Sequence, residues 1–293
     1  MRNAASAADY IRNRAADQTT GYSSAAALTF LAWDVCISFS LEVRLIWGRP
    51  NGYLRWLYAF IRYLPLFAEM VFFVYFVFPG PTTISAGKLC RANTVASAIV
   101  LECTIVAVEL VLLVRVHALY NRSRVVLVAL LAGFAASFCA TFFGMYSAAD
   151  HLQFDEQCLI SSAPRIMILV WLSPVAFDAF MFALTMLKFR QSRREGLRRP
   201  ILNTMVRDGT WAFILTLVVM VLNAVIYTVF SETLSGIFYF WATSVLSFIG
   251  SHVLLNLRQI ALEPRLSWDY GSDSTTICLD DIDFTASDET VVS

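Results

Sequence analysis

Charged residues are scarce in this chain of 293 amino acids. Asp, Glu, Lys and Arg together make up 15% of the sequence, whereas soluble globular domains contain about 25%. Hydrophobic residues make up 58%, above the ~45–50% of soluble domains. Because 22 basic residues balance 22 acidic ones, the net charge indicates no class of partner. The composition excludes an ordinary soluble globule and points to a membrane protein.

The sequence also lacks the motifs of common catalytic and cofactor sites. It contains no H-E-x-x-H, G-x-S-x-G or P-loop pattern. Its three histidines show no metal-ligand spacing. Its two lysines, Lys88 and Lys188, lie outside the apolar runs, so neither can hold a retinal Schiff base there. We therefore predict a protein that is not an enzyme and has no cofactor and no metal site.

Seven stretches of the chain are apolar enough to be membrane spans. Each has at least the roughly 18–20 residues that cross a ~30 Å hydrocarbon core as a helix. The six strongest, followed by a weaker seventh, are Leu54–Phe78, Thr94–Val116, Val125–Tyr146, Ile166–Leu187, Thr210–Phe230, Gly236–Leu257 and Ser24–Trp47. Their apolarity is continuous rather than alternating, which excludes a membrane β-barrel. The sequence thus predicts an all-α protein, a seven-helix transmembrane bundle.

Basic residues are distributed unevenly between the two ends of these spans. With seven spans, fifteen Lys and Arg residues fall on one side and six on the other, while Arg62 lies inside a span. Basic loops stay in the cytosol. We therefore expect the C-terminus and the loop KFRQSRREGLRRP to be cytosolic and the N-terminus to lie outside. The choice between plasma membrane and endomembrane stays open.

The two ends of the chain differ in composition from the bundle at 24–257. Residues 1–23 are small and polar, without the apolar core of a cleavable signal peptide, and are predicted to form an extracytosolic tail or a short amphipathic helix. Residues 258–293 form the C-terminal segment, which carries seven acids and no base from Leu266 onward. This composition is typical of a disordered tail.

Two of the six cysteines lie outside the spans on the predicted external side. Cys90 precedes the third span, and Cys158 follows the fourth. An oxidising compartment would allow a disulfide between them, and two free thiols are the alternative. Cys36, Cys103 and Cys139 lie within spans, where we expect small packing residues.

Ionisable residues inside the spans are the most informative feature of the sequence. Such residues are rare at membrane depth and usually face the bundle interior or a water-filled cavity. In the stretch LTFLAWDVCISFSLEVRLIW, Asp34, Ser38 and Glu42 follow one another at intervals of four. This spacing puts all three on one face of a helix, so we expect them to face other helices and not lipid.

The second and third spans carry acids and one arginine at matching depths. Arg62 and Glu69 are seven residues apart and share a helix face, and Glu102 and Glu109 repeat this spacing on the next span. With a rise of 1.5 Å per residue, Arg62 is level with Glu109. We predict an Arg62–Glu109 ion pair, with Glu42 as the alternative partner of Arg62. Glu69 and Glu102 should form a carboxyl pair with at least one member protonated, since like charges that close cannot both ionise at low cost.

Further polar side chains lie on the last three spans. The complete candidate network is Asp34, Glu42, Arg62, Glu69, Glu102, Glu109, Asp178, Asn223 and His252. Two interpretations are open. Polar groups between helices can simply hold them together, at roughly 0.6 kcal/mol per contact. Alternatively, they can form a ligand-binding, proton-linked or ion-linked site.

The segments around these carboxylates resemble a known family. The stretches WD (33–34), EVRLIW (42–47) and IRYLP (61–65) are similar to the N-terminal signature of a fungal family of multi-span membrane proteins, known as domain of unknown function 6533. The stretch VRVHALY (114–120) is similar to the end of the third span in that family. The family's typical positions are present as Asp34, Glu42, Trp47, Arg62 and Tyr63. The resemblance implies a fungal membrane protein of seven spans and no particular activity.

Three functions are compatible with these patterns. The first is a receptor-like or sensor-like membrane protein whose polar interior binds a small molecule or responds to protonation. The second is a proton- or ion-linked transporter or channel, and the third is a structural scaffold. The outline is also similar to that of G-protein-coupled receptors, but their Asp-Arg-Tyr and Asn-Pro-x-x-Tyr motifs are missing. The expected partners are the lipid bilayer, a small-molecule ligand and a cytosolic protein at residues 188–207 or the C-terminal tail, but not nucleic acid.

Overall fold

The protein is built almost entirely of helices. In this computed structural model, the described residues are 2–48, 52–77, 86–149, 153–154, 160–162, 166, 168–194, 200–229 and 235–267. The helices are α1 (Arg2–Glu42), the π-helical turn η1 (Val43–Trp47), α2 (Gly52–Val77), α3 (Ala86–Leu119), α4 (Arg124–Ala149), α5 (Ile168–Arg194), α6 (Pro200–Val229) and α7 (Ser235–Ser267). Two short antiparallel strands, β1 (Gln153–Phe154) and β2 (Ile160–Ser162), lie between α4 and α5. Across the described residues, the predicted seven-helix architecture is confirmed.

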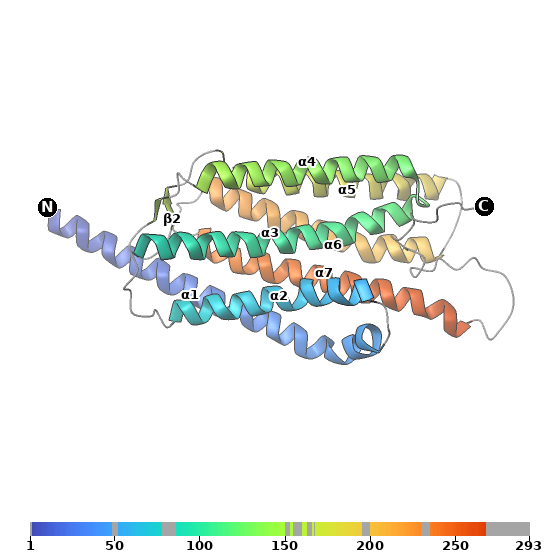
Figure 1. Cartoon of the computed structure of the whole chain (residues 1–293), viewed down its shortest axis with the longest axis horizontal. Coiled ribbons are helices and arrows are strands. Elements are labelled where there is room, and N and C mark those ends of the chain that lie inside the picture. The colour runs from blue at the N-terminus through green and yellow to red at the C-terminus, as the bar shows by residue number, and fades with distance from the viewer. Residues whose placement is uncertain are drawn as a thin grey trace, which may run out of the picture.

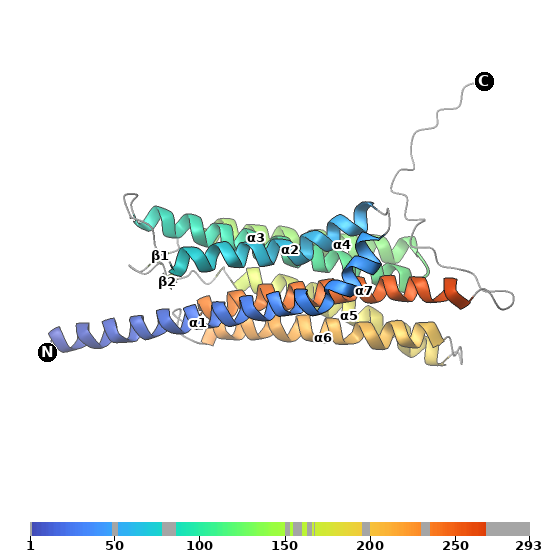
Figure 2. The ribbon, with the colours of Figure 1, turned by 90° about the horizontal axis from the view of Figure 1, so that it is seen from below.

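The seven α-helices run side by side along the long axis of the molecule (Figure 1). The view from below shows α2 and α3 on one side and α1, α6 and α7 on the other (Figure 2). α7 contacts α1, α2, α3 and α6, whereas α5 contacts α3, α4 and α6. Of the apolar spans, that of α7, Tyr239–Gln259, is the most buried, since 61% of its apolar stretch lies inside the protein. α7 is therefore the central helix.

Six helices within the described residues are long and apolar enough to cross a membrane, by length and composition. Their spans lie in α1 to α5 and in α7, and the first runs over Gln18–Trp47 despite its two carboxylates. α6 contributes a shorter apolar stretch, Thr210–Val225. Large apolar side chains such as Trp33 and Phe142 are exposed on the outside of the bundle, as a lipid-facing surface requires. This pattern is that of a multi-pass membrane protein.

The first and last helices extend beyond the predicted bundle. α1 begins at Arg2, so the segment predicted as a polar tail or amphipathic helix continues the first span as one helix. α7 continues to Ser267, past the predicted end of the bundle at Leu257. Residues 268–293, which make up most of the predicted acidic tail, lie outside the described residues.

The predicted Cys90–Cys158 disulfide gains no support. Cys158 and the side chain of Cys90 lie outside the described residues, and no cysteine pair at disulfide distance occurs among those that are described. Cys36, Cys103 and Cys139 are free thiols. Cys36 and Cys139 are exposed and Cys103 is half-buried, so of the three predicted packing residues Cys103 is the one with the more buried position.

α7 comes close to α2 and α3 at Gly250. A Cβ atom at this position would lie 2.7 Å from Ile61 Cγ2 and 2.9 Å from Val108 Cγ2. Both neighbours are buried members of the main apolar core. Small residues allow helix backbones to approach closely in membranes, and Gly250 has this role where three helices meet.

Replacing Gly250 with valine should therefore destabilise the bundle. Overpacking of this kind costs about 1–3 kcal/mol, and the free energy of unfolding in detergent measures it. Gly52→Val is the matched control, because a Cβ at Gly52 would meet no atom within 4 Å. Equal stability of the two variants would show that the α7 contact is looser than described.

Candidate functional site

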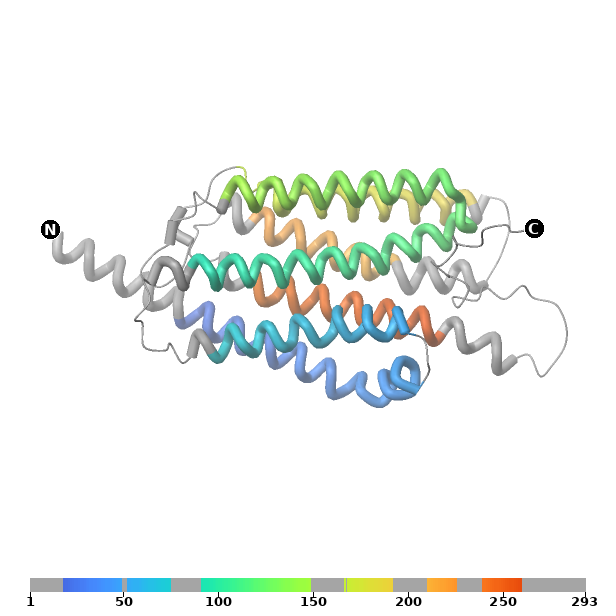
Figure 3. The backbone as a smooth tube through the Cα atoms, viewed as in Figure 1, coloured from blue at the N-terminus to red at the C-terminus, as the bar shows by residue number. Residues whose placement is uncertain are grey.

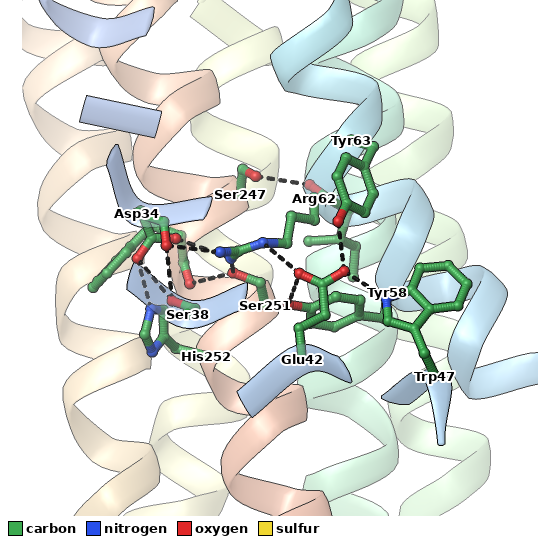
Figure 4. A network of polar contacts seen from close by, with 12 residues as sticks. Asp34, Ser38, Glu42, Trp47, Tyr58, Arg62, Tyr63, Ser247, Ser251 and His252 are labelled. Carbon is green, nitrogen blue, oxygen red and sulfur yellow. Dashed lines mark hydrogen bonds and ion pairs between the residues drawn. The ribbon is translucent and has the colours of Figure 1, made fainter. Parts of the chain in front are cut away.

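The centre of the polar interior is Arg62 on α2, whose side chain is fully buried. Its Nη1 atom lies 2.9 Å from Oδ2 of Asp34 on α1. Its Nε atom lies 3.4 Å from Oε2 of Glu42, the last residue of α1. The guanidinium therefore lies between two carboxyl groups, and Figure 4 shows it pointing from α2 toward both.

Arg62 also makes hydrogen bonds that are not to carboxylates. Its Nη2 donates to the backbone carbonyl oxygen of Asp34, at 2.9 Å. Its Nη1 donates to the Ser251 hydroxyl of α7, also at 2.9 Å. One side chain thus joins α1, α2 and α7. Because the planar guanidinium has five N–H donors in a fixed arrangement, arginine suits this three-way junction better than lysine would.

The carboxyl group of Glu42 accepts hydrogen bonds from three aromatic residues. The Tyr58 hydroxyl donates to Oε2 at 3.2 Å, and the Tyr63 hydroxyl donates to Oε1. The Trp47 Nε1–H donates to Oε1 at 2.8 Å. Glu42 is fully buried, and with these donors and Arg62 both carboxylate oxygens have partners. A buried charge held in this way avoids most of the penalty of an unpaired ion.

The contact between Glu42 and Trp47 depends on the local helix geometry. The two residues are five apart, and in an α-helix this spacing points side chains in different directions. Here the chain forms the π-helical turn η1, in which the Gly48 amide bonds to the Val43 carbonyl, also five residues back. The turn brings the indole N–H of Trp47 within hydrogen-bonding distance of the Glu42 carboxylate. The backbone bends sharply at this turn (Figure 3). Arg258 of α7 donates to the Leu45 carbonyl of this turn at 2.9 Å.

A proline on α2 creates a second link to α7. Pro65 lies inside the helix and has no N–H, so the carbonyl of Ile61, four residues earlier, loses its helical donor. The Ser247 hydroxyl of α7 donates to this carbonyl at 2.8 Å. Interhelical side chains commonly replace backbone bonds freed by proline in membrane helices. Ser247 therefore fixes the contact between α2 and α7 one turn from Ser251.

His252 on α7 contacts the other side of Asp34. Its Nε2 lies 2.9 Å from Asp34 Oδ1, and its ring packs on Phe248 with centroids 4.4 Å apart. Ser38 donates its hydroxyl to the Asp34 backbone carbonyl at 2.9 Å. The histidine side chain is 30% exposed, whereas that of Arg62 is fully buried. His252 is thus placed at the margin of the network.

The structure brings together four of the predicted site residues, namely Asp34, Glu42, Arg62 and His252. The alternative prediction that Glu42 contacts Arg62 is confirmed. The preferred Arg62–Glu109 ion pair is wrong, because Arg62 points to α1 and α7 and not to α3. Sequence spacing gives depth and face on a single helix, but it does not show which neighbouring helix that face meets.

The predicted Glu69–Glu102 carboxyl pair is not found. Glu69 is buried on α2 and accepts hydrogen bonds from the Ser244 hydroxyl of α7, at 2.9 Å and 3.0 Å. Glu102 instead lies within electrostatic range of Glu109 on its own helix. Asn223 of α6 stands apart from both groups, since its amide donates to the carbonyl of Val219 one turn earlier.

A second group of predicted residues forms a separate cluster. Glu109 of α3 lies within electrostatic range of Asp178 of α5 as well as of Glu102. Glu109 and Asp178 are buried, with 4% and 2% of their surfaces exposed. Within the described residues, no three His, Cys, Asp or Glu side chains are grouped so that they could hold a metal ion.

Comparison with known proteins identifies the segment that contains most of the Arg62 network. Residues 22–67 match the model of a family of unknown function, DUF6533. This segment is similar to the DUF6533 domain. No curated protein and no solved structure matches the chain. The family match confirms the resemblance seen in the sequence over these residues and carries no information on the source organism.

The DUF6533 segment contains every residue of the Arg62 network on α1, η1 and α2. Asp34, Glu42 and Arg62 lie within it, and so do the aromatic donors to Glu42. The partners outside the segment are Ser251 and His252 of α7. The polar positions of the domain therefore form one connected structure that docks on the central helix.

Sequence reasoning missed Tyr58 and the donor role of Trp47. A buried glutamate needs donors for both oxygens, and this requirement directs attention to aromatic N–H and O–H groups nearby. Tyr58 lies four residues before Arg62, so both are on one face of α2. No signal in the sequence predicts the π-helical turn that positions Trp47.

Replacing Arg62 with alanine should lower the free energy of unfolding by about 3–5 kcal/mol, because it leaves buried carboxylates without their cation. Unfolding in mixed micelles measures the change. Arg124→Ala is the control, since this arginine is exposed at the start of α4. A small loss for Arg62→Ala would mean that water reaches the site.

A double-mutant cycle should distinguish the observed partner of Arg62 from the one first predicted. Coupling between Arg62→Ala and Asp34→Ala is expected in the range of about 0.5–3 kcal/mol, as for residues in one network. Arg62→Ala and Glu109→Ala should be additive. Coupling to Glu109 and additivity with Asp34 would contradict the arrangement described.

Proposed function

We propose that this protein is a receptor-like or sensor-like membrane protein. In this proposal, protonation of His252 controls how α7 packs on the DUF6533 segment. The proposal rests on one observation. The network contains two carboxyl groups and one guanidinium, and among the described residues the one further basic group that contacts a carboxylate of the network is the partly exposed imidazole of His252, bound to Asp34. A proton on His252 would complete the balance of charge.

The chemistry of the His252–Asp34 contact supports this role. A carboxylate oxygen only accepts hydrogen bonds, so the Nε2 atom that lies 2.9 Å from Asp34 Oδ1 carries the hydrogen. A second proton would therefore bind at Nδ1. Histidine is the side chain whose ordinary titration falls between about pH 5 and pH 8. The other polar members of the network are an arginine, acids, tyrosines, a tryptophan and serines, which do not ordinarily change charge there.

The surroundings of His252 give the added charge one main target. α1 contributes Asp34, α2 contributes Arg62 behind it, and α7 itself contributes Arg258, which binds the Leu45 carbonyl. The described side chains of α6, Thr210–Val225, include no ionisable group. A charge on His252 would thus act mainly on the Asp34–Arg62 pair. Such local charge changes become global when they bias the packing of an element, here α7.

The proton- or ion-linked transporter is the second candidate, and one observation favours it. Besides the Arg62 network, Glu109 of α3 has two further acids within electrostatic range, Glu102 of its own helix and Asp178 of α5. Rows of acids across a span are typical of proton relays. Uptake of protons by vesicles that contain the purified protein would favour transport over sensing.

The sensor proposal predicts that His252→Gln abolishes a pH response of α7. Hydrogen–deuterium exchange of full-length protein in nanodiscs, corrected for intrinsic rates, should change several-fold in the α7 region between about pH 5 and pH 8. The glutamine keeps a donor toward Asp34 but cannot gain a charge. His117→Gln on α3 is the matched control and should retain the response. A wild-type response that survives in His252→Gln would refute the proposal.

A further inference from the structure

The acids of α3 and α5 differ from the Arg62 network because no base accompanies them within the described part of the chain. Glu109 and Asp178 are almost fully buried, with 4% and 2% of their surfaces exposed. Among the described residues, Glu109 Oε1 and both carboxyl oxygens of Asp178 have no hydrogen-bond partner. The charged groups that act on Glu109 are Asp178 and Glu102, both acids.

A buried hydroxyl of α6 lies on the side of that helix that faces α5. Thr216 is 2% exposed, and its Oγ1 has no hydrogen-bond partner among the described residues. α5 and α6 run antiparallel (Figure 2) and touch through the rings of Phe182 and Phe213, 6.3 Å apart. Asp178 lies one turn before Phe182, and Thr216 lies one turn after Phe213. Because the two helices run in opposite directions, a step back along α5 and a step forward along α6 lead toward the same end of the pair. Asp178 and Thr216 therefore lie at the same level, on the sides of α5 and α6 that face each other.

Among the side chains that the structure describes, those of the neighbouring helices place no cation beside these acids. The described part of α6, Thr210–Val225, has no ionisable side chain. On α4, α2 and α7, the ionisable side chains that the structure describes outside the Arg62 network are Arg124, Cys139, Tyr146, Tyr53, Arg55, Glu69, Tyr239 and Arg258. Arg124 begins α4, Arg55 lies over the Trp47 ring, and Arg258 binds the Leu45 carbonyl. On their own helices, Arg115 and His117 follow Glu109 by at least six residues, and Lys188, ten residues after Asp178, lies over the Tyr120 ring.

We propose that Glu109 and Asp178 form a proton-binding site at the interface of α3 and α5, with the Thr216 hydroxyl as its neighbour. Two adjacent carboxylates without a cation would repel each other in a medium of low polarity. A bound proton removes one charge and converts an acceptor into an O–H donor. That donor can serve the unpaired oxygen atoms of the second acid or of Thr216.

Proton binding at this site needs no other reactant. A hydronium ion in solvent gives its proton to a carboxylate oxygen, an O–H bond forms, and water is left. This site is separate from the sensor element at His252 because it lies on α3 and α5, whereas the Arg62 network joins α1, α2 and α7. The two proposals can therefore fail independently.

Infrared difference spectroscopy of the full-length protein in phosphatidylcholine vesicles tests the proposal, with the proton itself as the probe. At neutral pH the wild type should show the carbonyl stretch of a protonated carboxylic acid. The band should lose intensity in Glu109→Gln and in Asp178→Asn, and the double variant should lack this component. Both substitutions replace an acid with a neutral group of the same shape, so the fold should survive.

Asp34→Asn is the matched control, because Asp34 is paired with Arg62 and should not contribute to the acid band. A band that is unchanged in the Glu109→Gln/Asp178→Asn double variant would overturn the proposal. If that variant does not fold, Thr216→Val provides a second test, since loss of the hydroxyl should shift the frequency of the band. An unshifted band in folded Thr216→Val would then count against the site.

A metal ion in place of the proton is the remaining outcome. Thermal stability measured in sodium chloride and in choline chloride at equal ionic strength should be the same for the wild type. A melting temperature raised by sodium in the wild type but not in Asp178→Asn would assign the acids to a metal cation and overturn the proton site. Loss of the pH response in His252→Gln together with an intact acid band would leave both proposals standing.

Discussion

The fold depends on the placement of one guanidinium between two carboxylates. Transfer of a lone ion from water to the interior of a protein costs several kcal/mol even after relaxation. Arg62, Asp34 and Glu42 are each at least nine-tenths buried, so each is tolerable only because the others are present. The neighbouring hydrogen bonds complete this arrangement: aromatic donors bind Glu42, and His252 and Ser251 bind Asp34 and Arg62. Asp34 and Glu42 can therefore be buried in the first span because Arg62 of the second span pairs with both.

The central helix serves this network mainly through small polar groups. Ser247 donates to the carbonyl that Pro65 leaves free, Ser251 accepts from Arg62, and Ser244 donates to Glu69. Gly250 lets the backbone come close enough for these short side chains to reach. Hydroxyls and glycine have little bulk and little rotamer freedom to lose. α7 can thus contact four helices and still satisfy their polar groups.

The two groups of buried ionisable residues are opposites in charge balance. On α1, α2 and α7, the carboxylates have a cation and hydrogen-bond donors, which favours a fixed junction with the partly exposed imidazole of His252 at its edge. On α3 and α5, Glu109 Oε1 and both carboxyl oxygens of Asp178 have no hydrogen-bond donor among the described residues, and the charged groups within electrostatic range of Glu109 are acids. Because unpaired buried charge is costly, a change in bound protons is expected to affect packing at this second interface.

The sequence by itself determined the number of helices and the place of each apolar stretch, because continuous apolarity over about 20 residues permits only a membrane helix. It also determined that Asp34 and Glu42 share a face, since the period of a helix fixes that, and that Arg62 needs an acid. Only the tertiary structure decided which acid. Glu109 lies at a suitable depth, but the rotation of α2 about its axis points Arg62 to α1 and α7, and packing between helices distant in sequence sets that rotation. The π-helical turn that brings Trp47 to Glu42 was likewise beyond the sequence, because an insertion of this kind is stabilised by contacts from α7, such as that of Arg258 with the Leu45 carbonyl, and not by local preference.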